Sequence, residues 1–284
     1  MTRRAIAVVG AMAATGLVLS ASPAHAVKAP ADARPRAAEP LVPVTPPAAA
    51  QPWQPRMGAA VRFARGRRGR IAIAIRTPTR AWHWHANSTF PSASVLKAML
   101  LVAYLNRPSV RFRALRASDR ALLAPMIRRS ANGPANRLIG IVGLPGLRRL
   151  ARRVGMRRFT PVAGTWGASR ITASDQARFF VRIDRFMSAR HRAYAMTLLR
   201  TIVPEQRWGI ARVRPPGWKL YFKGGWGSGT GGVENQVALL RRDNRRVSVA
   251  ILTQHNGSHE YGKATLRGIA LRLLAGLKGA EAVP

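Results

Sequence analysis

The segment FPSASVLKAML at residues 90–100 places Ser94 three residues before Lys97. On a helix, residues three apart share one face, so the hydroxyl and the amine would lie side by side. A serine becomes a nucleophile when a neighbouring base takes its proton, and a lysine whose pKa is lowered by burial can be that base. Only six of the 48 basic residues are lysines. Since arginine does not deprotonate at any working pH, a lysine kept here indicates that a free amine is needed.

Ser-x-x-Lys is common by chance, but two further segments of the chain indicate that it belongs to a set of motifs. SAN at residues 130–132 follows a helical pattern, and KGG at residues 223–225 ends the run WKLYF and enters a glycine-rich turn. This order resembles the serine β-lactamase and penicillin-binding protein superfamily, whose motifs are S-x-x-K, S-D-N and K-T-G. FPSASVLKAML, MIRRSANGPANRLI and ITASDQARFF are most similar to the class A β-lactamase branch. The resemblance extends from about Arg70 to Leu274.

Four catalytic residues follow from this resemblance. Ser94 would attack a carbonyl carbon and become acylated, and Lys97 would accept or relay its proton. Ser130 would pass that proton to the leaving nitrogen. Lys223 would hold Ser130 and the carboxylate of the substrate.

The resemblance also implies four substrate-binding residues. Asn132 would hydrogen-bond the substrate amide, and Gly224 and Gly225 would line the strand beside the substrate. The backbone N–H groups of Ser94 and Trp226 would form the oxyanion hole. Trp226 is the tryptophan that we expect to contact a ligand.

Three positions depart from the family pattern. Ala131 stands where the second motif has aspartate, and Gly224 stands where the third has threonine or serine. Class A enzymes hydrolyse the acyl-enzyme with a water activated by a glutamate of the omega loop, but residues 159–171, FTPVAGTWGASRI, contain no Glu, Asp, Asn or Gln. Acylation is therefore expected and rapid deacylation is not. Glu205 and Glu234 are the nearest alternative carboxylates, and we expect both to be surface ion partners of arginines.

The spacing of apolar residues predicts the elements that position these groups. Strands are expected at residues 70–75 and 82–85, forming a hairpin, and at 218–222, 233–240 and 246–253. SVLKAMLLVAYL at residues 94–105 predicts a helix buried on all sides, residues 115–199 are mostly helical in spacing, and residues 263–277 predict a final helix. The fold class is thus α/β (α+β): a β-lactamase/transpeptidase-like fold with a five-stranded antiparallel sheet flanked by helices, plus an all-helical lobe.

The chain divides into three predicted parts. Residues 1–26 have the basic start, apolar run and Ala24-His25-Ala26 site of a secretory signal peptide. Residues 27–56 are a linker rich in proline and alanine. Residues 57–284 form the hydrolase domain, with a sheet lobe at about 57–90 and 210–284 and a helical lobe at about 91–209. The mature protein is expected to be secreted or associated with the cell wall, with no membrane span after the signal.

Composition limits the partners. The formal net charge is +38, which favours loose attraction to anionic envelope polymers, but the arginines are scattered and do not indicate specific nucleic-acid binding. There are no cysteines. His83, His85, His255 and His259 do not form a metal-ligand pattern, so neither a metal nor a cofactor is expected. A monomer is expected.

Three functions fit these residues. The first is a secreted serine hydrolase that forms an acyl-serine with β-lactams, or with a related amide or ester, and releases it slowly. The second is a penicillin-binding-type D-alanyl-D-alanine carboxypeptidase acting on wall peptides, favoured by the missing omega-loop glutamate. The third is a non-catalytic binding module of the cell envelope, favoured by the altered second and third motifs.

Overall fold

A computed structural model describes residues 53–227 and 231–277 of the 284-residue chain. The predicted signal peptide and residues 27–52 of the predicted linker lie outside the described residues. The helices and strands, in chain order, are α1 Met57–Arg65, β1 Arg70–Arg76, β2 Ala81–Trp84, β3 Thr89–Pro91, α2 Leu96–Leu105, α3 Pro108–Arg111, α4 Ala117–Arg128, α5 Asn132–Val154, β4 Arg170–Thr172, α6 Ala173–Val181, α7 Ala189–Arg200, β5 Lys219–Gly227, β6 Val233–Arg242, β7 Arg245–Gln254 and α8 His259–Leu273. Short 3₁₀ turns are η1 Ala93–Val95, η2 Trp166–Ala168, η3 Ile183–Phe186, η4 Pro204–Gln206 and η5 Gly209–Val213.

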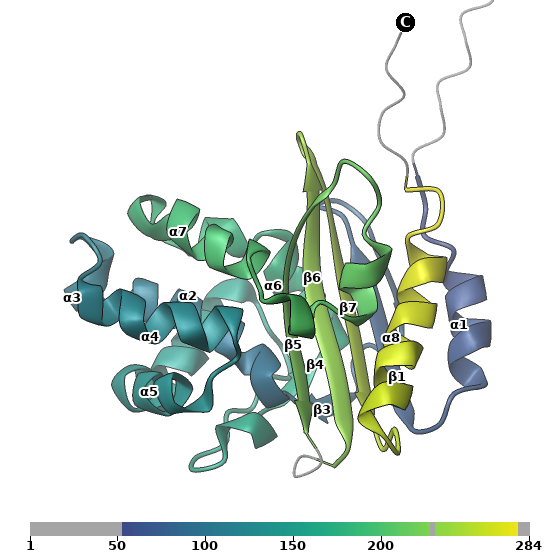
Figure 1. The fold of residues 1–284 in the computed structure, drawn as a ribbon, viewed down its shortest axis with the longest axis horizontal. Helices are drawn as coiled ribbons and strands as arrows, with labels where there is room; N and C mark the ends of the chain where they lie inside the picture. The colour runs from purple at the N-terminus through teal and green to yellow at the C-terminus, as the bar shows by residue number, and fades with distance from the viewer. Residues whose placement is uncertain (1–52, 228–230, 278–284) are drawn as a thin grey trace, which may run out of the picture. The chain divides into compact units, whose positions relative to one another are not determined.

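A five-stranded sheet has the order β2-β1-β7-β6-β5, and every neighbouring pair is antiparallel. The predicted sheet and hairpin are therefore confirmed. Figure 1 shows α1 and α8 on one face of this sheet, with α2 to α7 on the other. The edge strand β5 is the one that carries Lys223.

Two apolar clusters fill the space on either side of the sheet. Alternate residues of the strands point to opposite faces: Ile73 and Ile75 of β1 pack under α1 and α8, whereas Ala72 and Ala74 face the larger helical cluster. Every residue of α2 except Ala103 is buried, as its apolar sequence predicts. This helix occupies the middle of the helical lobe and carries Lys97 on its first turn.

Several local predictions need correction. Ser94 does not begin an α-helix but lies in the turn η1, and α2 starts at Leu96. Residues 223–225 do not enter a turn, because β5 continues to Gly227 through pairing with β6. The sequence also gave no sign of α1 or of the small sheet formed by β3 and β4. These two strands join the segment before Ser94 to the residues after the loop at 157–169.

Candidate active site

Ser94 lies in the turn η1, at the start of α2. Ser94 is half-buried, and its neighbours Ala93 and Val95 are buried. Ala93 has a φ of 42°, a left-handed conformation that is strained for alanine. Ser92 N donates to Ser169 O at 2.8 Å, and Val95 N donates to Ser92 O at 3.1 Å. The backbone of this turn is thus fixed by the loop that precedes β4.

Lys97 is fully buried and points at the second motif. Its Nζ donates to Ser130 O at 2.5 Å and to Asn132 Oδ1 at 2.7 Å, and lies 3.3 Å from Ser130 Oγ. Burial lowers the pKa of Lys97 to about 7. At neutral pH a large fraction of this lysine is therefore an uncharged amine that can accept a proton.

Ser130 stands between two amines. Its Oγ accepts a hydrogen bond from Lys223 Nζ at 3.0 Å, in addition to the contact with Lys97. Ser130 has a φ of 57°, which turns the chain sharply between α4 and α5. The next residue, Ala131, is the N-cap of α5 and provides no side-chain cap. In place of the missing aspartate, backbone contacts hold this turn: Ala131 N donates to Pro125 O at 3.1 Å.

Lys223 is also fully buried, and its second donor contact is to Gly224 O at 2.8 Å. Burial, together with the nearby charge of Lys97, holds the pKa of Lys223 well below its ordinary value. A charge on Lys97 therefore disfavours protonation of Lys223, on the other side of the Ser130 hydroxyl. Such an arrangement can move a proton between the groups at little cost.

Gly225 brings the backbone of β5 against the turn of Ser94. A Cβ added at Gly225 would lie 2.7 Å from both Ser94 N and Val95 N. Only glycine permits this approach. The following residue, Trp226, lies on the opposite face of the strand, where its ring is 5.8 Å from the ring of Trp208.

The departure at Gly224 has a steric explanation. A Cβ there would lie 3.3 Å from the Trp208 ring, so the ring already covers the side where a threonine would project. Trp208 is held by Gln236, whose Nε2 donates to Trp208 O and whose Oε1 accepts from Ile210 N, both at 2.7 Å. The Trp208 ring thus occupies the space that a threonine side chain at position 224 would need. The sequence did not indicate that Trp208 lies at the site.

The loop at residues 157–169 covers Lys97 with an aromatic ring. Lys97 Nζ lies 5.0 Å from the centre of the Trp166 ring, and Trp166 Nε1 donates to Asn136 Oδ1 at 2.8 Å. Ser92 Oγ donates to Gly167 O at 3.3 Å, which ties the loop to the nucleophile segment. Trp166 was not assigned to the site from the sequence. A large aromatic residue among the small residues of FTPVAGTWGASRI was the only available signal.

The carboxylates that were expected to be surface partners of arginines behave differently. Glu205 is exposed in η4, and within the described residues it has no arginine partner. The prediction for Glu234 is wrong: its side chain is 2% exposed, and its Oε2 lies 2.8 Å from His259 Nδ1. Glu234 lies on β6, opposite Trp226. It is separated from Lys97 by the thickness of the sheet, since it faces α8.

Two observations concern the described part of the chain only. In residues 53–227 and 231–277, no group of three or more histidine, cysteine or acidic side chains converges as a metal site would require. In the same residues, every helix is too short or too polar to cross a lipid bilayer.

Comparison with known proteins identifies one family. The model of the Beta-lactamase enzyme family matches residues 113–277, a segment that includes Ser130 and Lys223 and starts after Lys97. A search of curated protein sequences finds no match.

Solved β-lactamase structures share the fold over the whole domain. A β-lactamase from Sphaerobacter thermophilus DSM 20745 is 21% identical, covers 79% of this chain and 98% of its own, and has a TM-score of 0.67. A β-lactamase from Xanthomonas campestris pv. campestris str. ATCC 33913 is 17% identical, with coverage of 76% and 95% and a TM-score of 0.66. An ancestral class A β-lactamase is 17% identical, with coverage of 77% and 98% and a TM-score of 0.65. The resemblance inferred from the three motifs is confirmed.

Proposed function

The chain belongs to the Beta-lactamase enzyme family and is a β-lactamase-like serine hydrolase, and from this we propose that a β-lactam, or a related amide or ester, acylates Ser94 and is released slowly. The proposal includes export of the protein and a place in or outside the cell wall. The charge of +38 would favour retention by anionic wall polymers.

The acylation step uses four side chains. Neutral Lys97 accepts the proton of Ser94 Oγ as the oxygen attacks the carbonyl carbon. The N–H groups of Ser94 and Trp226 stabilise the resulting oxyanion. When the carbon–nitrogen bond breaks, Ser130 Oγ gives its proton to the leaving nitrogen and is reprotonated from the lysine side. The contacts of 3.3 Å to Lys97 Nζ and 3.0 Å to Lys223 Nζ support this route.

One observation carries the proposal of slow release. The loop over Lys97 presents the ring of Trp166, and no carboxyl group, at 5.0 Å from Nζ. Hydrolysis of the acyl-serine needs a water molecule held near the ester carbonyl and a base to deprotonate it. The ring fills space next to the amine and offers no base, so the acyl-serine ester would persist once it has formed.

The same observation keeps a second candidate open. A D-alanyl-D-alanine carboxypeptidase of the penicillin-binding type would also be acylated at Ser94 without a loop carboxylate. Its distinguishing property is release of D-alanine from wall peptides ending in D-alanyl-D-alanine, which can be measured directly.

The decisive experiment follows the protein mass over time. Wild-type protein and the Ser94→Ala variant are incubated with a fluorescent penicillin, and intact mass spectra are recorded from seconds to hours. We expect one covalent adduct on the wild type, lasting minutes or longer, and none on Ser94→Ala. Steady turnover at many per second would refute slow release. A folded wild-type protein that takes no label would refute acylation and favour the binding module.

Export is tested separately. The first 26 residues carry the order of charge, apolar run and small residues that signal peptidase recognises. N-terminal sequencing of the protein from the culture supernatant or cell wall should begin at Val27. Retention of the uncleaved chain in the membrane would refute this part of the proposal.

A further inference from the structure

The segment at residues 201–210 joins α7 to β5 and contains η4 and the first residues of η5. The acylation step uses none of its side chains. One end of the segment lies against the turn between α4 and α5, which carries Ser130. The other end lies against β5, which carries Lys223. The segment therefore contacts both of the elements whose side chains meet at 3.0 Å in the site.

The first end of the segment pairs with carbonyl groups at the end of α4. The last carbonyl groups of a helix have no partner within the helix. Val203 N donates to Arg128 O at 3.1 Å, and Gln206 Nε2 donates to Arg129 O at 2.7 Å. Arg129 directly precedes Ser130. The contact from Gln206 is thus made by a side chain and lies one residue from the bridging hydroxyl.

The contact from Gln206 holds the peptide unit that leads into Ser130. The carbonyl group of Arg129 and the N–H group of Ser130 belong to the same planar unit. On the other side, Ser130 O accepts a hydrogen bond from Lys97 Nζ at 2.5 Å. Both peptide units that flank Ser130 are therefore held at their oxygen atoms, in the left-handed conformation with φ of 57°. Since the backbone conformation limits the direction of a side chain, these contacts also orient Ser130 Oγ.

Few other side chains support this turn. Among the described residues, Gln206 and Lys97 are the side chains that bond to the backbone of residues 129–131. Ala131 is the N-cap of α5 and has no side chain that could cap the helix. Gln206 Oε1 is buried and has no hydrogen-bond partner among the described residues, which lowers stability. A glutamine at this position therefore calls for a role that depends on its Nε2 donor.

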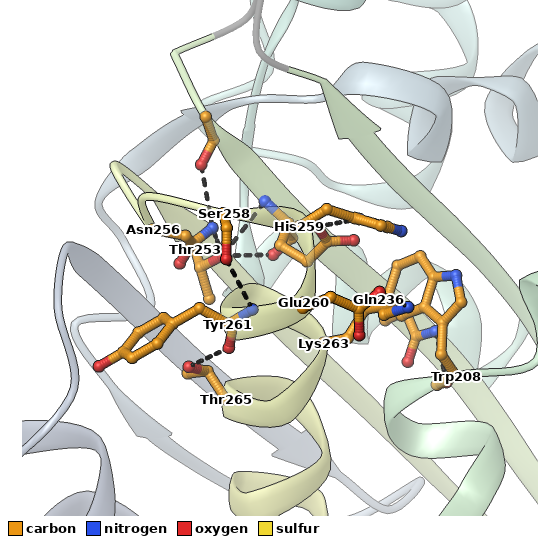
Figure 2. Close-up of polar contacts among 12 residues, drawn as sticks. Trp208, Gln236, Thr253, Asn256, Ser258, His259, Glu260, Tyr261, Lys263 and Thr265 are labelled. Carbon is orange, nitrogen blue, oxygen red and sulfur yellow. Dashed lines mark hydrogen bonds and ion pairs between the residues drawn. The ribbon is translucent and has the colours of Figure 1, made fainter.

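The other end of the segment is fixed to the sheet. Trp208 and Ile210 are buried in the cluster under α8, and the amide of Gln236 on β6 bonds to the backbone of both. Figure 2 shows Trp208 beside Gln236. The Trp208 ring lies against Gly224 of β5. Because one residue separates Gln206 from Trp208, this attachment to the sheet restricts where the Gln206 side chain can lie.

We propose that Gln206 is a positioning residue for Ser130: through the carbonyl group of Arg129, it holds Ser130 Oγ where this atom can give its proton to the leaving nitrogen. The inference rests on acylation of Ser94. A displacement of about 1 Å can reduce a rate about 10²-fold, so loss of one contact that holds the turn should slow this proton transfer at least tenfold.

The proton transfer concerns one of the two bonds that change. Ser94 Oγ bonds to the carbonyl carbon, and its proton passes to Lys97. The carbon–nitrogen bond breaks, and the nitrogen keeps the electron pair and takes the proton of Ser130 Oγ. Ser130 regains a proton from the lysine side. The proton lost by Ser94 is thus balanced by the proton gained by the leaving amine.

The leaving group separates this role from a general effect on the fold. An amine nitrogen needs a proton in order to leave, whereas p-nitrophenolate is weakly basic and leaves as an anion. A displaced Ser130 should therefore slow acylation by a penicillin and not acylation by p-nitrophenyl acetate. Distortion of the fold or of Lys97 would slow both reactions, because both need Ser94 to be deprotonated.

The test measures second-order rates of Ser94 acylation with these two acyl donors. Intact mass gives the rate for penicillin, and nitrophenolate absorbance gives the rate for the ester, with Ser94→Ala as the background for each. Gln206→Ala truncates the side chain, and Gln206→Glu keeps its shape but replaces the donor with an oxygen. We expect both variants to lose at least tenfold in the penicillin rate and to keep the ester rate. Glu205→Ala, at the exposed neighbouring position in η4, is the matched control and should keep both rates.

Ala131→Asp gives a second readout. An aspartate at this N-cap can accept a hydrogen bond from Gly133 N and so support the same turn from its other side. In Gln206→Ala, the added substitution should raise the penicillin rate about threefold or more. In the wild type, where Gln206 already holds the turn, it should change that rate less than about twofold.

Three results would overturn the proposal: equal losses for the two acyl donors, wild-type penicillin rates in both Gln206 variants, or no gain from Ala131→Asp in Gln206→Ala. A wild-type protein that is acylated by neither compound would instead refute acylation of Ser94, and with it any role of Gln206 in that step.

Discussion

The indole ring of Trp166 lies 5.0 Å from Lys97 Nζ and is oriented by a hydrogen bond from its Nε1 to Asn136. The ring covers the Lys97 amine on the side of the loop at residues 157–169, and the first of four predictions concerns this ring.

Trp166→Glu should shorten the lifetime of the acyl-enzyme. The substitution places a carboxyl group in the loop beside the nucleophile segment, and a positioned base contributes about 10²–10⁴-fold to such a step. We expect a gain of at least tenfold in the rate of deacylation, measured as loss of the adduct in intact mass spectra. Trp166→Gln is the matched control, since it removes the ring without adding a base. If both variants release the acyl group equally fast, the ring acts only by excluding water.

Lys97→Arg should abolish acylation while preserving the charge. Because the pKa of Lys97 is about 7, the wild-type acylation rate should rise with pH through 7 and then level off, as the protonated amine cannot act as a base. Lys219→Arg at the exposed start of β5 is the control and should label at the normal rate. Normal labelling of Lys97→Arg would show that another group accepts the proton.

Gly225→Ala should reduce acylation at least a hundredfold. The new methyl group would lie 2.7 Å from Ser94 N, so the strand or the nucleophile turn must move, and a small displacement of reacting groups can cost about 10²-fold in rate. Gly140→Ala in α5 is the control, because nothing lies within 4 Å of its Cβ. It should acylate normally and raise the free energy of unfolding by about 0.5–1 kcal/mol. A Gly225→Ala variant of normal rate would contradict the close approach.

Glu234→Gln should flatten the pH dependence of stability. The carboxyl pKa is about 8 in the folded protein and 4.5 without its surroundings, so the folded state holds the proton more tightly. Its stabilising contribution is complete below pH 4.5 and is lost as pH rises through 8. Relative to the variant, the wild type should lose on the order of 1–3 kcal/mol of unfolding free energy across this range, measured by urea titration.

His259 Nδ1 lies 2.8 Å from Glu234 Oε2, so the substitution also changes the titration of His259, and the difference between the two proteins measures the pH dependence of the pair. Glu205→Gln, at an exposed position, should reproduce the wild-type curve. A wild-type curve that is already flat would mean that the folded protein ionises Glu234 as readily as the unfolded chain does.

The three motifs could be read from the sequence because each combines residue types with a local spacing. Ser94 and Lys97 are separated by less than one helical turn, and the strand that carries Lys223 shows its own apolar pattern. The fold class followed from the same periodicities. The roles assigned to the motif residues remain predictions until the variants above are measured.

Contacts between distant segments were not predictable in this way. Trp166 reaches Lys97 across 69 positions of sequence only because β3 and β4 pair, and both strands are three residues long. Trp208 covers Gly224 because Gln236 donates a hydrogen bond to the Trp208 carbonyl, and the spacing of apolar residues gives no sign of this contact. The error at Glu234 arose from composition: the abundance of arginine suggested an arginine partner, but the β-sheet register turns this side chain under α8.

Ala93, which precedes the nucleophile, and Ser130, which carries the hydroxyl between the two lysines, are non-glycine residues of positive φ, and each is strained by about 1–3 kcal/mol. In a chain without cysteines, only packing and hydrogen bonds offset that strain. Directed evolution of this protein for heat resistance alone would therefore favour Ala93→Gly and hydrophobic replacements of the two buried lysines. The most thermostable variants would be expected to lose acylation of Ser94 while the sheet and its helices remain folded.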